Sequence, residues 1–312
     1  MRREWSVAIA IGALAATLAI VTPSYFSAEN LRDIFLVNMP VLVVAIGTTL
    51  VILTGEIDIS AGSSFAVCSV AAGVAAKAGM PDALAGLTAC AAGAAIGAVN
   101  GALVAYAGIP SIVVTLAAMV ALRDGLRWTT QGAWIADLPP RFQWLGVSQS
   151  TFPFVTGLAV GCLVVAFAWA MRHLAAGRAV YATGSNAQAA RLASIDTALV
   201  KLSVFTAGGA LTGLAALLNS VRFNQIPSNT GIGLEMKVVA AVVVGGAAIT
   251  GGRGTLTGTV LGVTLLGAIG PALTFVGVSA QWERALQGAI ILAAVTVDAA
   301  RAGVSRTSLA GA

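Results

Sequence analysis

The sequence predicts an all-α, polytopic membrane protein, and its composition, the spacing of its charges and its many glycines support that prediction. Of the 312 residues, 58% are hydrophobic and 9% are charged, whereas soluble domains carry about 25% charged residues. The mean hydropathy is +0.93. The longest uncharged run, between Asp82 and Arg123, holds two spans, because one span needs about 20 apolar residues. The 36 glycines allow helices to pack closely in a membrane.

Apolar runs bounded by glycine, proline and charge predict about ten transmembrane helices within one domain, residues 1–312. The first is interpreted as an uncleaved helix, because its apolar run is longer than that of a signal peptide. The expected spans are Trp5–Val21, Pro40–Leu53, Ser60–Ala76, Leu84–Tyr106, Ile112–Leu122, Phe152–Met171, Leu202–Leu218, Val238–Ile249, Leu256–Phe275 and Ala285–Val297.

The distribution of basic residues predicts the topology. Arg2 and Arg3 favour a cytoplasmic N-terminus. The densest polar insert falls on the same side of the predicted membrane and carries Arg172, Arg178, Arg191 and Lys201. An even number of spans then places both termini in the cytoplasm. The main external loop is expected at residues 123–151, whose tryptophans suit a membrane interface.

Several kinds of chemistry have no sequence signal. The net charge of +5 comes from basic residues at span ends and in short loops, so it indicates topology and not nucleic acid. Cys68, Cys90 and Cys162 lie in apolar runs without a metal spacing, and His173 is the sole histidine, so neither a catalytic nor a metal site is expected. No phosphate-binding loop ending in Gly-Lys-Ser/Thr occurs, so any ATP is hydrolysed by another subunit.

Two glycine-rich segments interrupt apolar runs in a similar way. Residues 54–63 and 250–259 both begin with Thr-Gly and continue with a later Gly-Ser or Gly-Thr. Such interruptions are typical of discontinuous helices around a transport path. Glu56 and Asp58 lie in the first segment, and an acid within the membrane indicates a functional site. A short cytoplasmic turn, with both carboxylates in water and Asp58 or Ser60 capping the next helix, explains them equally well.

Polar residues within or beside the spans are predicted to line a solute pathway. Amides and hydroxyls donate to and accept from the hydroxyl groups of a sugar without a buried charge. Interhelical hydrogen bonding is the alternative explanation. The predicted pathway residues are Asn38, Glu56, Asp58, Ser60, Gly62, Ser63, Asn100, Thr115, Asn219, Asn229 and Glu235.

The polar insert at residues 177–196 is predicted to dock onto a cytoplasmic ATPase. Ser185 or Asn186 is suited to cap a short helix with a modest apolar face. Such a helix fits the groove of a partner, and an ordinary surface helix is the alternative. The predicted coupling residues are Arg178, Tyr181, Gly184, Asn186, Ala189, Ala190 and Arg191, the last of which is expected to pair with an acid of the ATPase.

Taken in order, these elements resemble the permeases of ribose-type ABC importers over nearly the whole chain. The family pattern Gly-x-Ile-Asp-Leu/Ile-Ser-x-Gly-Ser appears at residues 55–63, followed by Asn100-Gly101-x-Leu103-Val104, the segment 177–191, and Gly251-Gly252-Arg253-Gly254. Residues 132–139, 181–184 and 226–237 look most like autoinducer-2 and rhamnose permeases. Glu56 departs from the family, where a glycine or another small or polar residue is common.

The resemblance implies the ABC importer permease fold and a bacterial inner-membrane complex. That complex has two permease subunits, alike or different, a cytoplasmic ATPase that binds ATP and Mg²⁺, and a periplasmic solute-binding protein. Membrane lipids would surround it. The implied function is import of a small sugar or sugar-like solute by alternating access, with no cofactor bound by this chain. An ion-coupled secondary carrier is the alternative that Glu56 and Asp58 keep open, whereas clustered catalytic residues for a membrane enzyme are missing.

Overall fold

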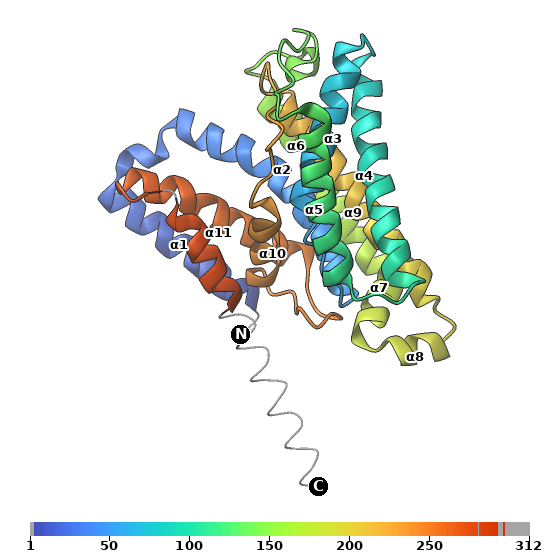
Figure 1. Cartoon of the computed structure of the whole chain (residues 1–312). Helices are drawn as coiled ribbons and strands as arrows, with labels where there is room; N and C mark the ends of the chain where they lie inside the picture. Colours follow the sequence, from blue (N-terminus) through green and yellow to red (C-terminus); the bar gives the residue numbers. More distant parts are fainter. Residues whose placement is uncertain (1–2, 280, 293–295, 297–312) are drawn as a thin grey trace.

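The computed structural model describes residues 3–279, 281–292 and 296 as an almost entirely helical chain (Figure 1). Within these residues, the extended backbone forms only an isolated bridge, between Ile135 and Ile226. Residues 282–292 are also helical. The named helices are α1 (Arg3–Val21), η1 (Pro23–Phe26), α2 (Ala28–Leu53), α3 (Ala61–Lys77), α4 (Asp82–Ala105), α5 (Ser111–Thr130), η2 (Gln143–Gly146), α6 (Phe152–His173), α7 (Ala175–Ser185), α8 (Ala187–Leu192), α9 (Thr197–Ser220), α10 (Leu234–Val244) and α11 (Leu256–Phe275).

Two groups of helices meet along α2. In one group α3, α4, α5 and α9 lie side by side, with α9 in contact with α2, α3 and α4 (Figure 1). In the other, α1 packs on α11, and α10 packs on both α11 and α2. The helix α2 is almost completely buried from Pro40 to Leu53, which explains why this stretch is apolar on every side.

Glycines hold α4 and α9 in close contact. A side chain at Gly93 would overlap the carbonyl of Gly209, and one at Gly97 would overlap the carbonyl of Phe205. Gly213 meets the carbonyl of Ala89 in the same way. Because water and lipid tails provide little force between helices inside a membrane, such backbone contact is a main source of helix association there.

The predicted count of about ten spans is confirmed only for six helices in the described part of the chain. By length and hydropathy, α1, α2, α4, α6, α9 and α11 are able to cross a membrane. The apolar helix α3 has 17 residues and α10 has 11, so both are short for a span. The predicted span Ala285–Val297 extends beyond the described residues.

The predicted span Ile112–Leu122 and the loop after it need correction. The helix α5 continues to Thr130 and therefore includes Arg123, Asp124 and Arg127, which were expected in the loop. The remaining loop, residues 131–151, is tied to residues 221–226 by backbone bonds. Trp144 does not lie free at an interface, because it packs edge-on against the ring of Phe152.

We call residues 131–151 and 221–226 the outer rim. Backbone hydrogen bonds join its two segments as a short ladder. Ile135 N–H donates to the Ile226 carbonyl at 3.0 Å, and Ile226 N–H donates back at 2.9 Å. Leu138 N–H reaches Asn224 and Trp144 N–H reaches Val221. The rim lies at the end of the molecule opposite to α7 and α8 (Figure 1).

The N-terminal helix begins at the same end as the predicted coupling segment. The hydroxyls of Thr255 and Thr257 donate to the Glu4 carboxylate, at 2.6 and 3.1 Å. The next residue back, Gly254, accepts a hydrogen bond from the Tyr181 hydroxyl of α7. The two elements thus lie at one end of the molecule, as a shared side of the membrane requires, whereas the C-terminus lies outside the described residues.

The close glycine contact between α4 and α9 predicts that a large side chain at this contact destabilises the protein. Gly209→Leu should lower the free energy of unfolding by about 1–3 kcal/mol, because added carbons in a close-packed contact force the helices apart. Thermal melting of the purified protein measures this. Gly161→Leu on α6 is the matched control, since no atom lies within 4 Å of its added Cβ. Equal melting temperatures for the two variants would contradict the packing role.

Candidate solute pathway and coupling site

The short helices α3 and α10 begin beside each other. A side chain at Gly62, in the first turn of α3, would overlap the Glu235 carboxylate in the first turn of α10. Gly62 also faces the carbonyl of Gly231, which precedes α10. Discontinuous helices whose ends meet inside the protein are a common way to build a solute site in transporters. The structure thus brings together two predicted pathway residues from distant parts of the sequence.

Glu235 has one satisfied and one unsatisfied carboxylate oxygen. Its Oε1 accepts a hydrogen bond from Gly233 N–H at 3.2 Å. Its Oε2 is buried without a hydrogen-bond partner among the described residues, and Gly62 faces this atom. Because buried polar atoms are nearly always paired, Oε2 is an acceptor available to a polar ligand or to water.

A second polar cluster lies in the turn that leads into α3. Asp58 Oδ1 accepts from the N–H and the hydroxyl of Ser60, at 2.8 and 2.6 Å. Asn100 of α4 donates to the Ser60 hydroxyl at 3.0 Å, and the Thr115 hydroxyl of α5 lies 3.3 Å from the Ile57 carbonyl. Ser63, one turn further, donates to the Ser60 carbonyl at 2.9 Å. These residues bind one another and hold the turn in place.

Neither acid of this turn is a freely solvated carboxylate. Asp58 accepts from Ser60, the residue that precedes α3, and the Ser60 side chain forms no capping hydrogen bond to that helix, so the predicted cap by Ser60 is not observed. Glu56 forms an ion pair with Lys201 of α9, with 2.5 Å between Oε1 and Nζ. The side chains of Glu56 and Lys201 are 14% and 23% exposed. The sequence showed no basic residue near Glu56, and the fold supplies one.

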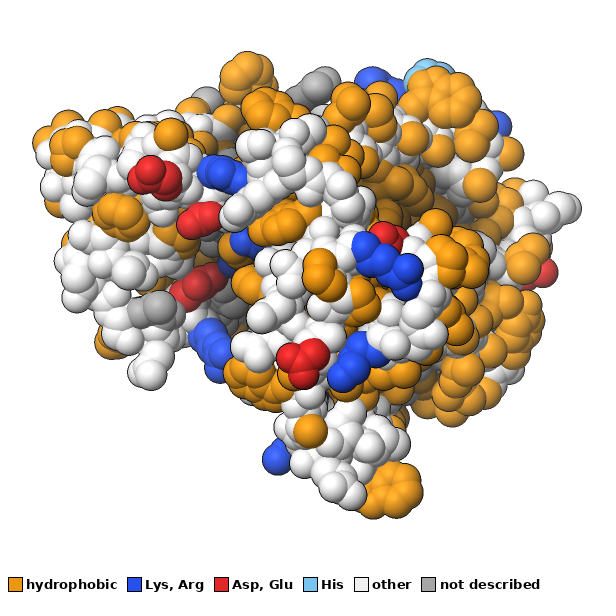
Figure 2. Space-filling model, turned by 90° about the horizontal axis from the view of Figure 1, so that it is seen from above, with side chains coloured by type: hydrophobic (Ala, Val, Ile, Leu, Met, Phe, Trp, Pro, Cys, Tyr) orange, Lys and Arg blue, Asp and Glu red, His pale blue; other side chains and the backbone are white. Residues whose placement is uncertain are grey.

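A polar cavity of about 590 Å³ lies beneath the outer rim, between α5 and the residues that precede α10. Arg123 at its wall donates to the Thr230 carbonyl at 2.8 Å. Figure 2 views this end of the molecule, where acidic and basic side chains lie beside each other over the middle of the face. The cavity is lined by Met119, Val120, Arg123, Asp124, Arg127, Gly132, Trp134, Ser228, Asn229, Ile232 and Glu235.

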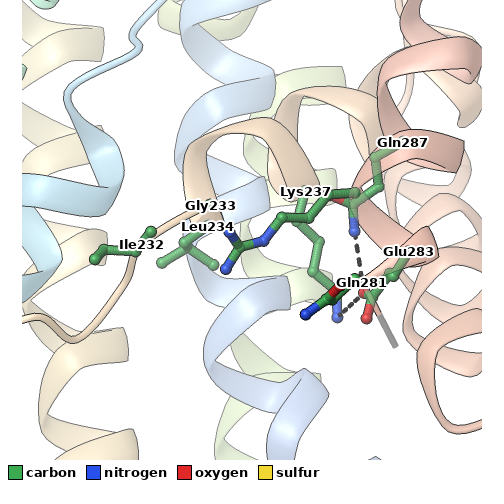
Figure 3. A pocket seen from close by; sticks show the side chains of 8 residues that line it. Ile232, Gly233, Leu234, Lys237, Gln281, Glu283 and Gln287 are labelled. Atoms are coloured by element: carbon green, nitrogen blue, oxygen red, sulfur yellow. Dashed lines mark hydrogen bonds and ion pairs between the residues drawn. The ribbon is translucent and has the colours of Figure 1, made fainter. Parts of the chain in front are cut away.

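A neighbouring cavity of about 660 Å³ lies on the other side of Ile232 (Figure 3). It opens between α10 and residues 281–287, and three of its polar side chains are paired with one another. Lys237 and Glu283 form an ion pair at 3.1 Å, and Gln287 donates to the same carboxylate at 3.0 Å. Of the predicted pathway residues, Asn229 and Glu235 line the first cavity and none lines this one.

Two predicted pathway residues lie apart from these clusters. Asn38 sits between α2 and α11, where it donates to the Ile34 carbonyl at 2.8 Å and contacts Gly267. Asn219 lies near the end of α9 and lines neither of the cavities described above. The hydrogen bond of Asn38 lies within α2, and its Oδ1 is buried without a hydrogen-bond partner among the described residues, so the interhelical hydrogen bond given as the alternative is not observed for it.

The two glycine-rich segments meet each other and the coupling segment. A side chain at Gly251 would overlap the backbone of Gly55 at 2.7 Å. A side chain at Gly184, near the end of α7, would overlap the carbonyl of Leu53 and, at 2.7 Å, the nitrogen of Gly252. Gly252 N–H donates to Leu53 at 2.9 Å. We call this three-way contact the glycine junction; it joins the end of α2, the loop before α11 and the end of α7.

The coupling segment forms two short helices, of which Asn186 caps the second. Its Oδ1 accepts from the N–H groups of Gln188 and Ala189, both at 3.0 Å, as one of the two predicted caps requires. Burial raises the pKa of the Tyr181 phenol, so it stays protonated and donates to Gly254 at 2.9 Å. Arg178 donates to the His173 carbonyl at 3.0 Å.

The exposed part of this segment differs from the prediction. Ala190 is only 4% exposed, so it packs within its own chain, whereas Ala189 is exposed. Arg191 donates through Nε to the Thr197 hydroxyl at 2.9 Å and so ties α8 to α9. Leu192, at the end of α8, is 90% exposed. It is the most exposed large hydrophobic side chain of α7 and α8.

Sequence reasoning missed four residues of these sites: Lys201, Arg123, Trp134 and Leu192. Lys201 was assigned only to topology, because its partner is far away in the sequence. Arg123 was placed in a loop, although its spacing of four from Arg127 fits one helix face. Leu192 was counted as part of an apolar helix face, but the shortness of α8 leaves that residue in solvent.

The described residues hold no group of three or more His, Cys, Asp or Glu side chains that would bind a metal ion. Cys68 is buried, and burial among apolar residues is its structural role. The helices able to cross a membrane, together with the short helices α3 and α10, define a polytopic helical protein of the membrane type.

Comparison with known proteins identifies the family. A family model described as "Branched-chain amino acid transport system / permease component" matches residues 30–295. The chain belongs to this permease family. No solved structure matches it significantly.

Similar curated relatives are permease components of import systems. The autoinducer 2 import system permease protein LsrC of Yersinia pseudotuberculosis serotype O:1b (strain IP 31758) is 36% identical over 296 residues, which cover 95% of this chain and 84% of the relative. LsrC of Enterobacter sp. (strain 638) is also 36% identical, over 95% of this chain and 86% of the relative. The predicted resemblance to ABC importer permeases, with the autoinducer-2 type among the most similar, is confirmed.

The contact between Gly62 and Glu235 yields a mutational prediction. Gly62→Leu should abolish solute uptake, because the new side chain must displace the Glu235 carboxylate and the backbone at Gly231. Uptake by cells that express the variant at the normal level measures this. Gly125→Leu on α5 should leave uptake intact, since no atom lies within 4 Å of its added Cβ. Unchanged uptake with leucine at position 62 would remove this contact from the pathway.

Proposed function

We propose that this chain is the membrane-spanning permease subunit of an ABC importer in a bacterial inner membrane. It carries a small sugar or sugar-like solute by alternating access and catalyses no reaction itself. The observation that carries the proposal is the connection between the two ends of the fold. The polar cavity lies under the outer rim, the start of α10 leads from it to Gly62, and the glycine junction joins that region to α7 and α8.

The chemistry of the cavity supports an uncharged, hydroxylated solute. Its wall carries two basic residues, Arg123 and Arg127, and two acidic ones, Asp124 and Glu235, so the charges balance. Asn229 and Ser228 add groups that donate and accept. Trp134, 52% exposed, offers an amphipathic ring for the apolar face of a sugar ring.

The relatives favour a sugar-like solute of the autoinducer-2 type. The family description names branched-chain amino acids, but the LsrC proteins match 95% of this chain and are named for autoinducer 2. Rhamnose and ribose remain the other solutes to test, as the sequence motifs indicate. The complex would also contain a second permease subunit, a cytoplasmic ATPase with its ATP and Mg²⁺, and a periplasmic solute-binding protein.

The energy source separates this proposal from an ion-coupled carrier. In proteoliposomes with the ATPase and the solute-binding protein, uptake of labelled autoinducer-2, rhamnose or ribose should require ATP on the ATPase side. It should persist when ionophores collapse the ion gradients. Uptake driven by an ion gradient without the ATPase would overturn the proposal. Glu56 already has a cationic partner in Lys201, which leaves it less suited to bind a coupling ion.

The exposure of Leu192 yields a prediction for ATPase binding. Leu192→Ala should weaken association with the ATPase about tenfold or more, because burying a leucine side chain contributes about 1.5–3 kcal/mol. Pull-down titration and uptake should fall together. Leu84→Ala, 48% exposed at the start of α4, is the control at the other end. Wild-type association in the Leu192 variant would refute this contact. Ala190→Glu is a poorer probe, because Ala190 is buried.

A further inference from the structure

The ion pair between Glu56 and Lys201 connects the turn that precedes α3 to α9. Glu56 lies three residues after Leu53, the last residue of α2, and two before Asp58. Lys201 lies in the second turn of α9. Among the ion pairs of the described residues, this one joins the turn at residues 54–60 to the element that follows the coupling helices.

Each end of the pair is fixed to a different functional region. On one side, the hydrogen bonds of Asp58, Ser60 and Asn100 bind the turn to α3 and α4, next to Gly62. On the other side, Arg191 of α8 donates to Thr197 in the first turn of α9. Polar contacts therefore tie α8 to the first turn of α9, and the second turn of α9 to residues 54–60, which we call the pathway turn.

Both charged side chains are largely shielded from solvent, which strengthens the attraction between them. With Glu56 14% and Lys201 23% exposed, solvent screens the pair less than it would at a surface. The pair borders a cavity of about 200 Å³ that Arg191 and Thr197 also line. At the glycine junction, Gly184 of α7 meets Leu53 and Gly252 through close backbone contact, and the hydrogen bond there, from Gly252 to Leu53, joins the loop before α11 to α2 and does not include α7.

We propose that Glu56 and Lys201 are positioning residues that make the pathway turn follow the movement of α8 and α9. The inference rests on the proposed function, because the movement is the one that an ATPase would impose on α8. A steric contact transmits a push, whereas an ion pair of opposite charges also transmits a pull. The ion pair thus makes the turn before α3 follow α9 in both directions of its movement during a transport cycle.

A neutral pair tests this with little risk to folding. In Glu56→Gln with Lys201→Gln, no lone buried charge remains, and replacing a buried ion pair by neutral groups is often tolerated. The reconstituted full complex is assayed for ATP hydrolysis and for solute taken up per ATP. Hydrolysis and assembly should stay near wild type, while uptake per ATP should fall about tenfold.

Exchange of the charges is the second test. Glu56→Lys with Lys201→Glu should recover at least half of the wild-type uptake per ATP, which a role of either side chain alone would not allow. Lys77→Gln is the matched control, because Lys77 donates to the Ala136 carbonyl at the outer end. It should leave uptake per ATP unchanged.

The outcomes separate this inference from the proposed function. Wild-type uptake per ATP in the neutral pair, or no recovery on charge exchange, would overturn the positioning role. Failure of the neutral pair to fold, judged by its melting temperature, would also overturn it and make the pair a structural one. If the wild-type complex itself shows no ATP-dependent uptake, it is the proposed function that fails.

Discussion

Close approach of glycine backbones is the constraint on which the arrangement of this protein depends. Along α4 and α9, carbonyl groups lie where side chains would otherwise project, and at the glycine junction three separate segments meet in the same way. Irregular backbone inside a membrane is tolerated only where protein or a water-filled cavity surrounds it. The junction satisfies that condition, because Gly252 N–H donates to the free carbonyl of Leu53 at the end of α2. The polar side chains of the candidate site lie around these backbone contacts.

The general fold and part of the site were predictable from local sequence. Uncharged runs predicted the long helices. The glycine-rich segments at 54–63 and 250–259 were interpreted as interruptions typical of a transport path, and the structure shows that they meet. Local rules also predicted the Asn186 cap. The predicted end of α5, at Leu122, was wrong, because charged residues were taken to mark the end of a span. In the structure, Arg123 and Arg127 continue the helix and line a cavity.

The remaining features depend on contacts between residues far apart in the chain. Nothing near Glu56 indicates that Lys201 lies beside it, and no periodicity indicates that Gly62 faces Glu235. Burial has the same limitation: Ala189 and Ala190 were both predicted to contact the ATPase, yet Ala189 is exposed and Ala190 is buried. Helix packing decides these outcomes, so composition and spacing predict which residues are polar but not which ones meet.

The backbone ladder of the outer rim has a mechanical consequence. Residues 131–151 and 221–226 are linked by four main-chain bonds, and residues 227–233 then lead directly to the start of α10. A protein that docks on this rim therefore meets a preformed contour and loses little entropy in ordering it. Because these bonds do not involve side chains, surface substitutions can alter which partner is recognised without loosening the rim.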